Sequence, residues 1–153
     1  MNDPKQLRYR NVFYKTYEFA YRAMPDVIEE FKKEFEANGL HENGMFFYSM
    51  DAMRRYSDTE ADVQMTFYQP AQEHNAPEGC ELGFADAFEW DDMTYRLVED
   101  DHSNKAQAAF VDMLNEESAA GKKITSPVFY EFFFRENEEG NKKPCCLIRA
   151  QFK

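Results

Sequence analysis

The sequence has few basic residues for its length, and this scarcity argues against one class of partner. Its 153 residues include 18 Lys and Arg against 29 Asp and Glu, which gives a formal net charge of −11. A protein that binds the phosphate backbone of nucleic acids needs clustered basic side chains. We therefore expect no nucleic-acid partner, whereas the acidic excess leaves a cationic ligand or a basic protein partner open.

Cysteine is scarce as well. Cys80, Cys145 and Cys146 form neither a disulfide framework nor a metal-ligand spacing. The three histidines lie in separate polar segments, so we expect no metal site and no bound cofactor. Because no residue pattern marks an activated nucleophile, we name no catalytic residue.

Long apolar runs are missing too. The N-terminal residues do not resemble a secretory signal, and no stretch approaches the roughly 20 apolar residues that a membrane-spanning helix needs. We therefore expect a cytoplasmic location and no membrane contact. The length fits a single domain over residues 1–153.

Aromatic residues are abundant, with 15 Phe and 9 Tyr, and they are densest in residues 125–135, TSPVFYEFFFR. This composition predicts a half-buried strand. Alternation places Phe129, Glu131 and Phe133 on one face and Tyr130 on the other. A carboxylate among rings is costly to bury unless something pairs with it. The face is therefore either partly wet or an aromatic ligand cleft with a negative charge at its base.

The rest of the chain predicts two helices and several strands. Apolar residues recur at helical spacing in residues 24–38 and 102–120, and a glycine ends each segment. Alternating or aromatic-rich segments predict further strands at 11–21, 45–50, 61–69, 82–90, 93–99 and 145–152. The polar residues 1–10 and 51–60 predict a loose lead-in and a loop.

The two halves of the chain match at a constant offset. Gly39 and Gly121, which end the two helical segments, lie 82 positions apart, since 121 minus 39 is 82. The same offset brings Phe47 onto Phe129. With one residue inserted, Val63, Met65 and Phe67 fall on Cys146, Ile148 and Ala150. So many coincidences in order indicate an internal duplication.

Each half therefore predicts a strand, a helix and two strands. The pseudo-repeats span residues 11–69 and 93–152, joined by a loop and a strand at 70–92. We expect an α+β fold of duplicated β-α-β-β units, with two helices on one face of an antiparallel sheet. The other face would form a ligand cleft where the halves meet.

Four segments carry a resemblance to a known family. They are IEEFKKEFEANGLHENGMFFYS, the strand DVQMTFYQPA, the second helix ending at Gly121, and SPVFYEFFF. In this order and spacing they resemble the gyrase-inhibitor-like superfamily, which includes the effector-binding domains of multidrug-responsive bacterial transcription activators. The resemblance covers almost the whole chain and implies a central cleft for amphipathic, often cationic, molecules.

The leading hypothesis is a stand-alone small-molecule-binding protein. Since no helix-turn-helix fits before Asn11, it would have to report its ligand through another protein. Trp90, the only tryptophan, either packs in the core or offers its ring to a cation. The alternatives are an acidic protein-interaction module, as the gyrase-inhibitor resemblance allows, and a small hydrolase with Glu131 or a neighbour as general base. The expected ligand-binding residues are Glu131, Phe129, Phe133, Phe47, Tyr130 and Trp90.

Overall fold

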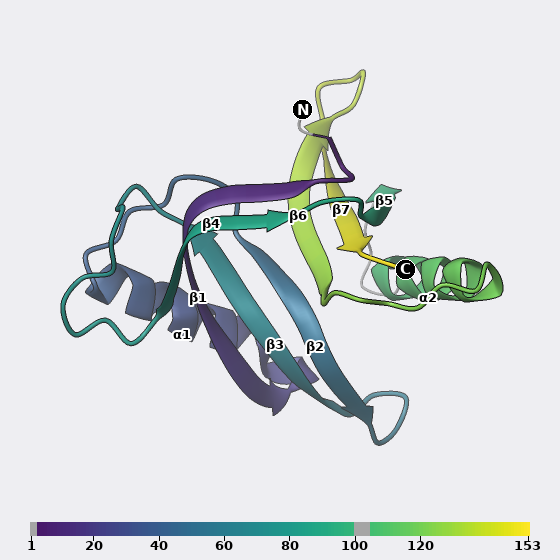
Figure 1. Cartoon of the computed structure of the whole chain (residues 1–153), viewed down its shortest axis with the longest axis horizontal. Coiled ribbons are helices and arrows are strands. Elements are labelled where there is room, and N and C mark those ends of the chain that lie inside the picture. Colours follow the sequence, from purple (N-terminus) through teal and green to yellow (C-terminus); the bar gives the residue numbers. More distant parts are fainter. Residues whose placement is uncertain (1–2, 100–104) are drawn as a thin grey trace. The chain divides into compact units, whose positions relative to one another are not determined.

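The structure, a computed structural model, describes residues 3–99 and 105–153 and has an α+β architecture (Figure 1). The chain divides into two compact units. The N-terminal unit comprises Arg8–Glu89, and the C-terminal unit comprises Met1–Leu7 with Trp90–Lys153. The single domain expected over residues 1–153 stays a prediction.

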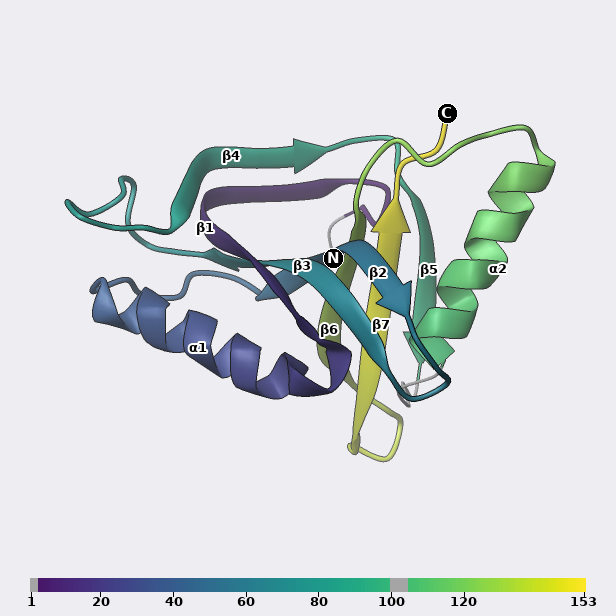
Figure 2. The same cartoon turned by 90° about the horizontal axis from the view of Figure 1, so that it is seen from below.

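The N-terminal unit contains four strands ordered β4-β1-β3-β2 among its described residues. Helix α1 covers one face of this sheet (Figure 2). Pro25 lies in its first turn, and Gly39 follows its end with a φ of 73°. The elements are β1 (Leu7–Ala20), a 3₁₀ turn (Tyr21–Ala23), α1 (Met24–Ala37), β2 (Phe47–Arg55), β3 (Ala61–Pro70) and β4 (Gly83–Trp90).

The C-terminal unit contains three strands ordered β6-β7-β5 among its described residues. Its helix buries Ala106 and Met113, and this confirms the predicted helix except at residues 102–104, which lie outside the described residues. The elements are β5 (Thr94–Glu99), α2 (Lys105–Ala119), β6 (Val128–Glu136) and β7 (Lys142–Ala150).

Both units place their last strand between the other two strands of the repeat, as β1-β3-β2 and as β5-β7-β6. This shared order confirms the duplicated β-α-β-β architecture. The registers correct the detail of the repeat. Phe47 pairs with Tyr68, and Phe129 pairs with Arg149, so the last strands align at an offset of 81. With the predicted one-residue insertion, the expected offset between these last strands was 83. A two-residue shift keeps every side chain on its face, so the alternation pattern could not reveal it.

Two strands are longer than predicted. β1 begins at Leu7, inside the expected lead-in, because Leu7 is buried and the carbonyl of Lys5 accepts a hydrogen bond from the Met93 amide. β2 continues to Arg55 through the expected loop, because its polar residues still pair with β3. The register shifts between Met50 and Ala52, which leaves Asp51 in a β-bulge.

Candidate functional site

Alternation gives the N-terminal sheet a helix-covered face and an opposite, helix-free face. Phe67 of β3 contacts Phe31 of α1, with ring centroids 6.0 Å apart, and so lies on the covered face. The next residue, Tyr68, therefore points to the helix-free face. Its cross-strand partner Phe47 lies on that face as well. The predicted site residue Phe47 is thus on the side of the sheet away from α1.

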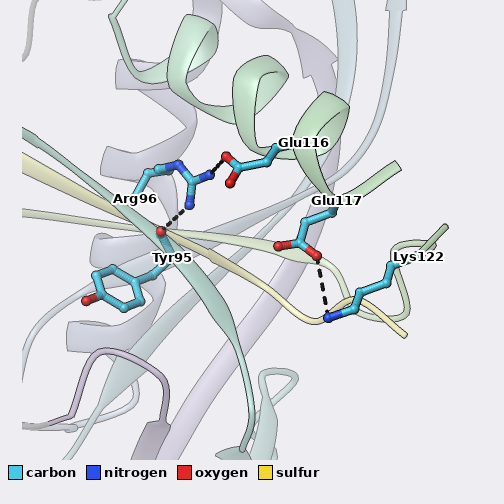
Figure 3. A network of polar contacts seen from close by, with 5 residues as sticks. All are labelled: Tyr95, Arg96, Glu116, Glu117 and Lys122. Carbon is cyan, nitrogen blue, oxygen red and sulfur yellow. Dashed lines mark hydrogen bonds and ion pairs between the residues drawn. The ribbon is translucent and has the colours of Figure 1, made fainter. Parts of the chain in front are cut away.

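An ion pair fixes the two faces of the C-terminal sheet. Arg96 of β5 donates to the Glu116 carboxylate of α2 and to the Tyr95 carbonyl, so the Arg96 side of the sheet is the helix-covered one. Figure 3 shows the Tyr95 ring on the opposite side of the strand. The Glu117 carboxylate of the same helix pairs with Lys122 just beyond its end, at 3.9 Å.

Tyr130 lies apart from the other predicted residues of its strand. It pairs with Ile148, which in turn pairs with Arg96, so its buried side chain is on the face covered by α2. Phe129 and Glu131 are its neighbours in sequence and therefore occupy the helix-free face. The alternation predicted for residues 125–135 is confirmed.

Glu131 forms a buried ion pair. The Arg149 guanidinium donates from Nη1 to Oε1 of Glu131 at 2.5 Å, and from Nε to the Pro4 carbonyl at 2.8 Å. Both charged side chains are almost fully buried, with exposed fractions of 6% and 5% for Glu131 and Arg149. The structure thus supplies the partner that a buried carboxylate requires.

This pair changes the chemistry expected at Glu131. Its negative charge is balanced by Arg149, so a cation would have to compete with an internal guanidinium. Arg149 was not predicted as a site residue from the sequence. The available signal was an isolated charge in the otherwise apolar run CCLIRA, in the strand that forms a hairpin with β6.

Two predicted aromatic residues accompany Glu131. The rings of Trp90 and Phe129 lie 6.0 Å apart at 49°, with Phe129 buried and Trp90 partly exposed. Phe133 is partly exposed, and the Arg135 guanidinium lies 5.7 Å from its ring centroid. The C-terminal unit therefore brings Trp90, Phe129 and the Glu131 pair together, whereas Phe47 belongs to the N-terminal unit.

Phe47 belongs to an aromatic cluster on the helix-free face of its own unit. It stacks on Tyr68 with ring centroids 4.7 Å apart and planes at 3°, and Tyr9 stacks on it at 4.9 Å. Phe88 and Tyr14 lie 4.9 and 5.9 Å from Tyr68. Phe47 is fully buried, while Tyr9, Tyr14 and Phe88 are partly exposed.

A carboxylate held by hydroxyl groups lies next to this cluster. Ser49 and Thr66 donate to the two oxygens of Asp51, at 2.7 and 2.6 Å. The Thr16 hydroxyl is 2.7 Å from that of Thr66. Since the single Thr66 proton points to Asp51, Thr16 donates to Thr66. The Tyr68 hydroxyl lies 3.3 Å from Ser49 Oγ and completes the chain.

The Asp51 carboxylate and the Tyr68 phenol of the aromatic cluster influence each other electrostatically. Burial raises the pKa of the Tyr68 phenol above its ordinary value of 10.0, and the negative charge of Asp51 raises it further. Both causes favour the neutral phenol. Asp51 was not predicted as a site residue, because the polar residues 51–60 favoured a loop. Its place beside Ser49 and Thr66 depends on the bulge and on pairing with β3.

No metal centre accompanies these features. Within residues 3–99 and 105–153, no group of three or more His, Cys, Asp or Glu side chains could hold a metal ion. His41 bonds to Glu73 at 2.9 Å, and hydrogen bonds from His41 lower the pKa of the Glu73 carboxyl. His74 contacts Asn11 at 3.1 Å.

In the part of the chain that the structure describes, neither helix has the length and apolar character to cross a membrane.

Comparisons with known proteins agree with this fold. A family model described as "Domain of unknown function (DUF5085)" matches residues 8–143. The crystal structure of the EcmrR C-terminal domain is similar, with a TM-score of 0.64 at 13% identity, over 97% of this chain and 95% of that one. At this identity the likeness concerns the fold alone, and it agrees with the predicted α+β fold. No curated protein matches the sequence.

Proposed function

The chain belongs to the DUF5085 family, and we propose that it binds small amphipathic or cationic molecules, as an effector-binding domain would. The fold shared with the EcmrR C-terminal domain supports this proposal. The resemblance to bacterial regulators and the scarcity of cysteine support a bacterial, cytoplasmic protein.

One observation carries the proposal. In both units the helix-free face of the sheet places aromatic rings beside a carboxylate: Phe129 with Glu131 in the C-terminal unit, and Tyr68 with Asp51 in the N-terminal unit. Ligand sites are mostly apolar and aromatic, with a few placed polar groups that orient the ligand. Rings and a carboxylate together suit an amphipathic molecule, and rings alone also attract cations.

Calorimetric titration with two matched probes tests the proposal. Biphenyl carboxamidine is an aromatic cation, and biphenyl carboxamide is its neutral counterpart of nearly the same shape. We expect saturable binding of at least the cation. Phe88 is partly exposed and its ring lies 4.9 Å from that of Tyr68, so Phe88→Ala should weaken binding about two- to fivefold through loss of the ring.

Phe134→Ala is the matched control. Phe134 is also an aromatic residue, but it is 69% exposed and lies, by alternation, on the helix-covered face of the C-terminal unit. Its truncation should leave the affinity for both probes unchanged. If neither probe binds wild-type protein up to its solubility limit, the proposal is wrong, and the acidic protein-interaction alternative becomes the better one.

A further inference from the structure

We propose that Asp51 is the cation-binding group of this protein, and that its ligands are organic cations that carry N–H donors beside an aromatic ring. This inference rests on the proposed function and assigns the polar end of the ligand site. It differs from the sequence-based hypothesis, which gave that role to Glu131.

The Asp51 carboxylate is accessible to solvent. Asp51 is exposed, whereas Glu131 is 6% exposed and already bonded to Arg149. The β-bulge at Asp51 turns its carboxylate onto the helix-free face, where Ser49 and Thr66 donate to it. Of Asp51 and Glu131, Asp51 is therefore the carboxylate that solvent and a ligand can reach.

Two hydroxyl groups hold the Asp51 carboxylate in a fixed orientation. Each oxygen of Asp51 accepts one hydrogen bond from a hydroxyl group, at 2.7 Å from Ser49 and 2.6 Å from Thr66. A carboxylate oxygen has two lone pairs, so each oxygen keeps one direction for a ligand. The two hydroxyl groups fix the rotation of the carboxylate. A planar amidinium or guanidinium can then donate to both oxygens at once, which makes a strong and directional pair.

An aromatic cluster lies beside the Asp51 carboxylate. The hydroxyl chain reaches the Tyr68 phenol, whose ring packs against Phe47, Tyr14 and Phe88. Tyr14 and Phe88 keep part of their surface exposed. A ligand that joins a cation to an aromatic ring can therefore meet Asp51 and a ring of this cluster together.

The helix-free face is hollowed on the side of Asp51 away from the aromatic cluster. The same face continues from Thr16 and Thr66 to Glu18 and Gln64, which pair across β1 and β3. These two residues and Ala52 help to line a depression of about 640 Å³, whose charged lining residues are Glu18, Asp62 and Arg54. Its two carboxylates outnumber the one guanidinium, and the depression gives room for substituents on the cation.

The charge of the N-terminal unit agrees with this assignment. Residues 8–89 contain eight Lys and Arg against sixteen Asp and Glu, a net charge of −8. The whole chain carries −11, so most of the negative charge resides in the unit that holds Asp51. This field raises the local concentration of cations.

Asp51→Asn tests the inference with the same pair of probes. The substitution removes the charge, keeps the size, and affects an exposed side chain, so the fold should persist. We expect biphenyl carboxamidine to bind about tenfold more weakly or worse, since a charge-assisted hydrogen bond is lost. The neutral amide should bind as before. Asp58→Asn, at an exposed position in the β2–β3 turn, controls for the loss of one negative charge and should leave both affinities unchanged.

The outcomes separate this inference from the proposed function. If both probes bind wild type and Asp51→Asn binds the amidine with unchanged affinity, Asp51 is not the anchor, although small-molecule binding stands. An equal loss with Asp58→Asn would also overturn the inference, because general charge would then explain the effect. If neither probe binds wild type, both proposals are wrong.

Discussion

At the scale of single residues, the buried pair of Glu131 and Arg149 sets the chemistry of the C-terminal unit. Removing two charges from water costs several kcal/mol for each ion, and their attraction offsets this cost only while both are present. Arg149 also donates to the Pro4 carbonyl. The pair therefore ties β6 to β7 and holds the N-terminal segment of the chain on the same unit.

Breaking this pair from one side should destabilise the protein strongly. We expect Glu131→Leu to lower the free energy of unfolding by about 3–5 kcal/mol, because Arg149 is left buried without its carboxylate. The double variant Glu131→Leu, Arg149→Met should regain most of this loss, since no buried charge remains. Urea unfolding measures both values. A double variant as unstable as Glu131→Leu would show that the buried charge is not the cause.

Tyr17 shows the opposite situation, a buried polar atom without a partner. Among the described residues its hydroxyl has no hydrogen-bond partner, and burial raises the pKa of Tyr17 to about 12, with the charges of Glu34 and Glu30 acting in the same direction. The folded state thus favours the neutral phenol more than the unfolded state does. This contribution is complete below pH 10 and is lost as the pH rises towards 12.

Tyr17→Phe should remove this pH dependence. The ring contact with Phe67, at 5.5 Å, is kept, while the unpaired hydroxyl disappears. We expect stability at neutral pH to stay equal or to rise by about 1–3 kcal/mol. Between pH 10 and 12 the variant should lose less stability than wild type. Thermal unfolding across this range gives the comparison, and parallel curves for the two proteins would contradict the assignment to Tyr17.

At the scale of elements, the features that depend on a single segment of the chain were predicted correctly. The 3.6-residue period of α1 and the alternation of β3 are properties of one segment, and both predictions are confirmed. Alternation also placed Phe129 and Glu131 correctly. The extra length of β1 and β2 escaped prediction, because the polar stretches 7–10 and 51–55 become strands only by pairing with distant segments.

Two site residues, Arg149 and Asp51, were not predicted for the same reason: their contacts join different strands. Arg149 meets Glu131 across a hairpin, and Asp51 meets Thr66 across β2 and β3. Neither contact has a spacing that can be read along the chain. The register of the two repeats shows the limit most clearly, because shifts that differ by two residues preserve the same alternation.

Helix α1 buries two aromatic residues, Phe31 and Phe35, against the sheet. Phe31 is fully buried, and its ring lies 6.2 Å from Phe46 and 6.0 Å from Phe67. We expect Phe31→Ala to lower the free energy of unfolding by about 3–5 kcal/mol, because it leaves a cavity between the helix and the sheet. Urea unfolding measures the loss. Val27→Ala, at a partly exposed position one turn earlier, should cost clearly less; equal losses would contradict the central role of Phe31.

At the scale of the whole molecule, charge decides which partners are excluded. The chain carries a formal charge of −11, with 18 basic residues. Several of these already pair with carboxylates: Lys15 with Glu34, Lys143 with Glu99, and Arg149 with Glu131. Binding to DNA requires several lysines or arginines that neutralise phosphates and release counterions. With a formal charge of −11, we expect the chain to repel the duplex.

We therefore expect no saturable binding to duplex DNA at about 0.15 M ionic strength. The measurement is fluorescence anisotropy of a labelled duplex, titrated with protein at low and at physiological salt. A lysine-rich protein, titrated in parallel, shows that the assay detects binding driven by phosphate contacts. Repulsion weakens as salt rises, so any residual contact should not follow the usual steep loss of affinity. Saturable binding that weakens systematically with added salt would show that a basic surface is exposed to DNA despite the net charge.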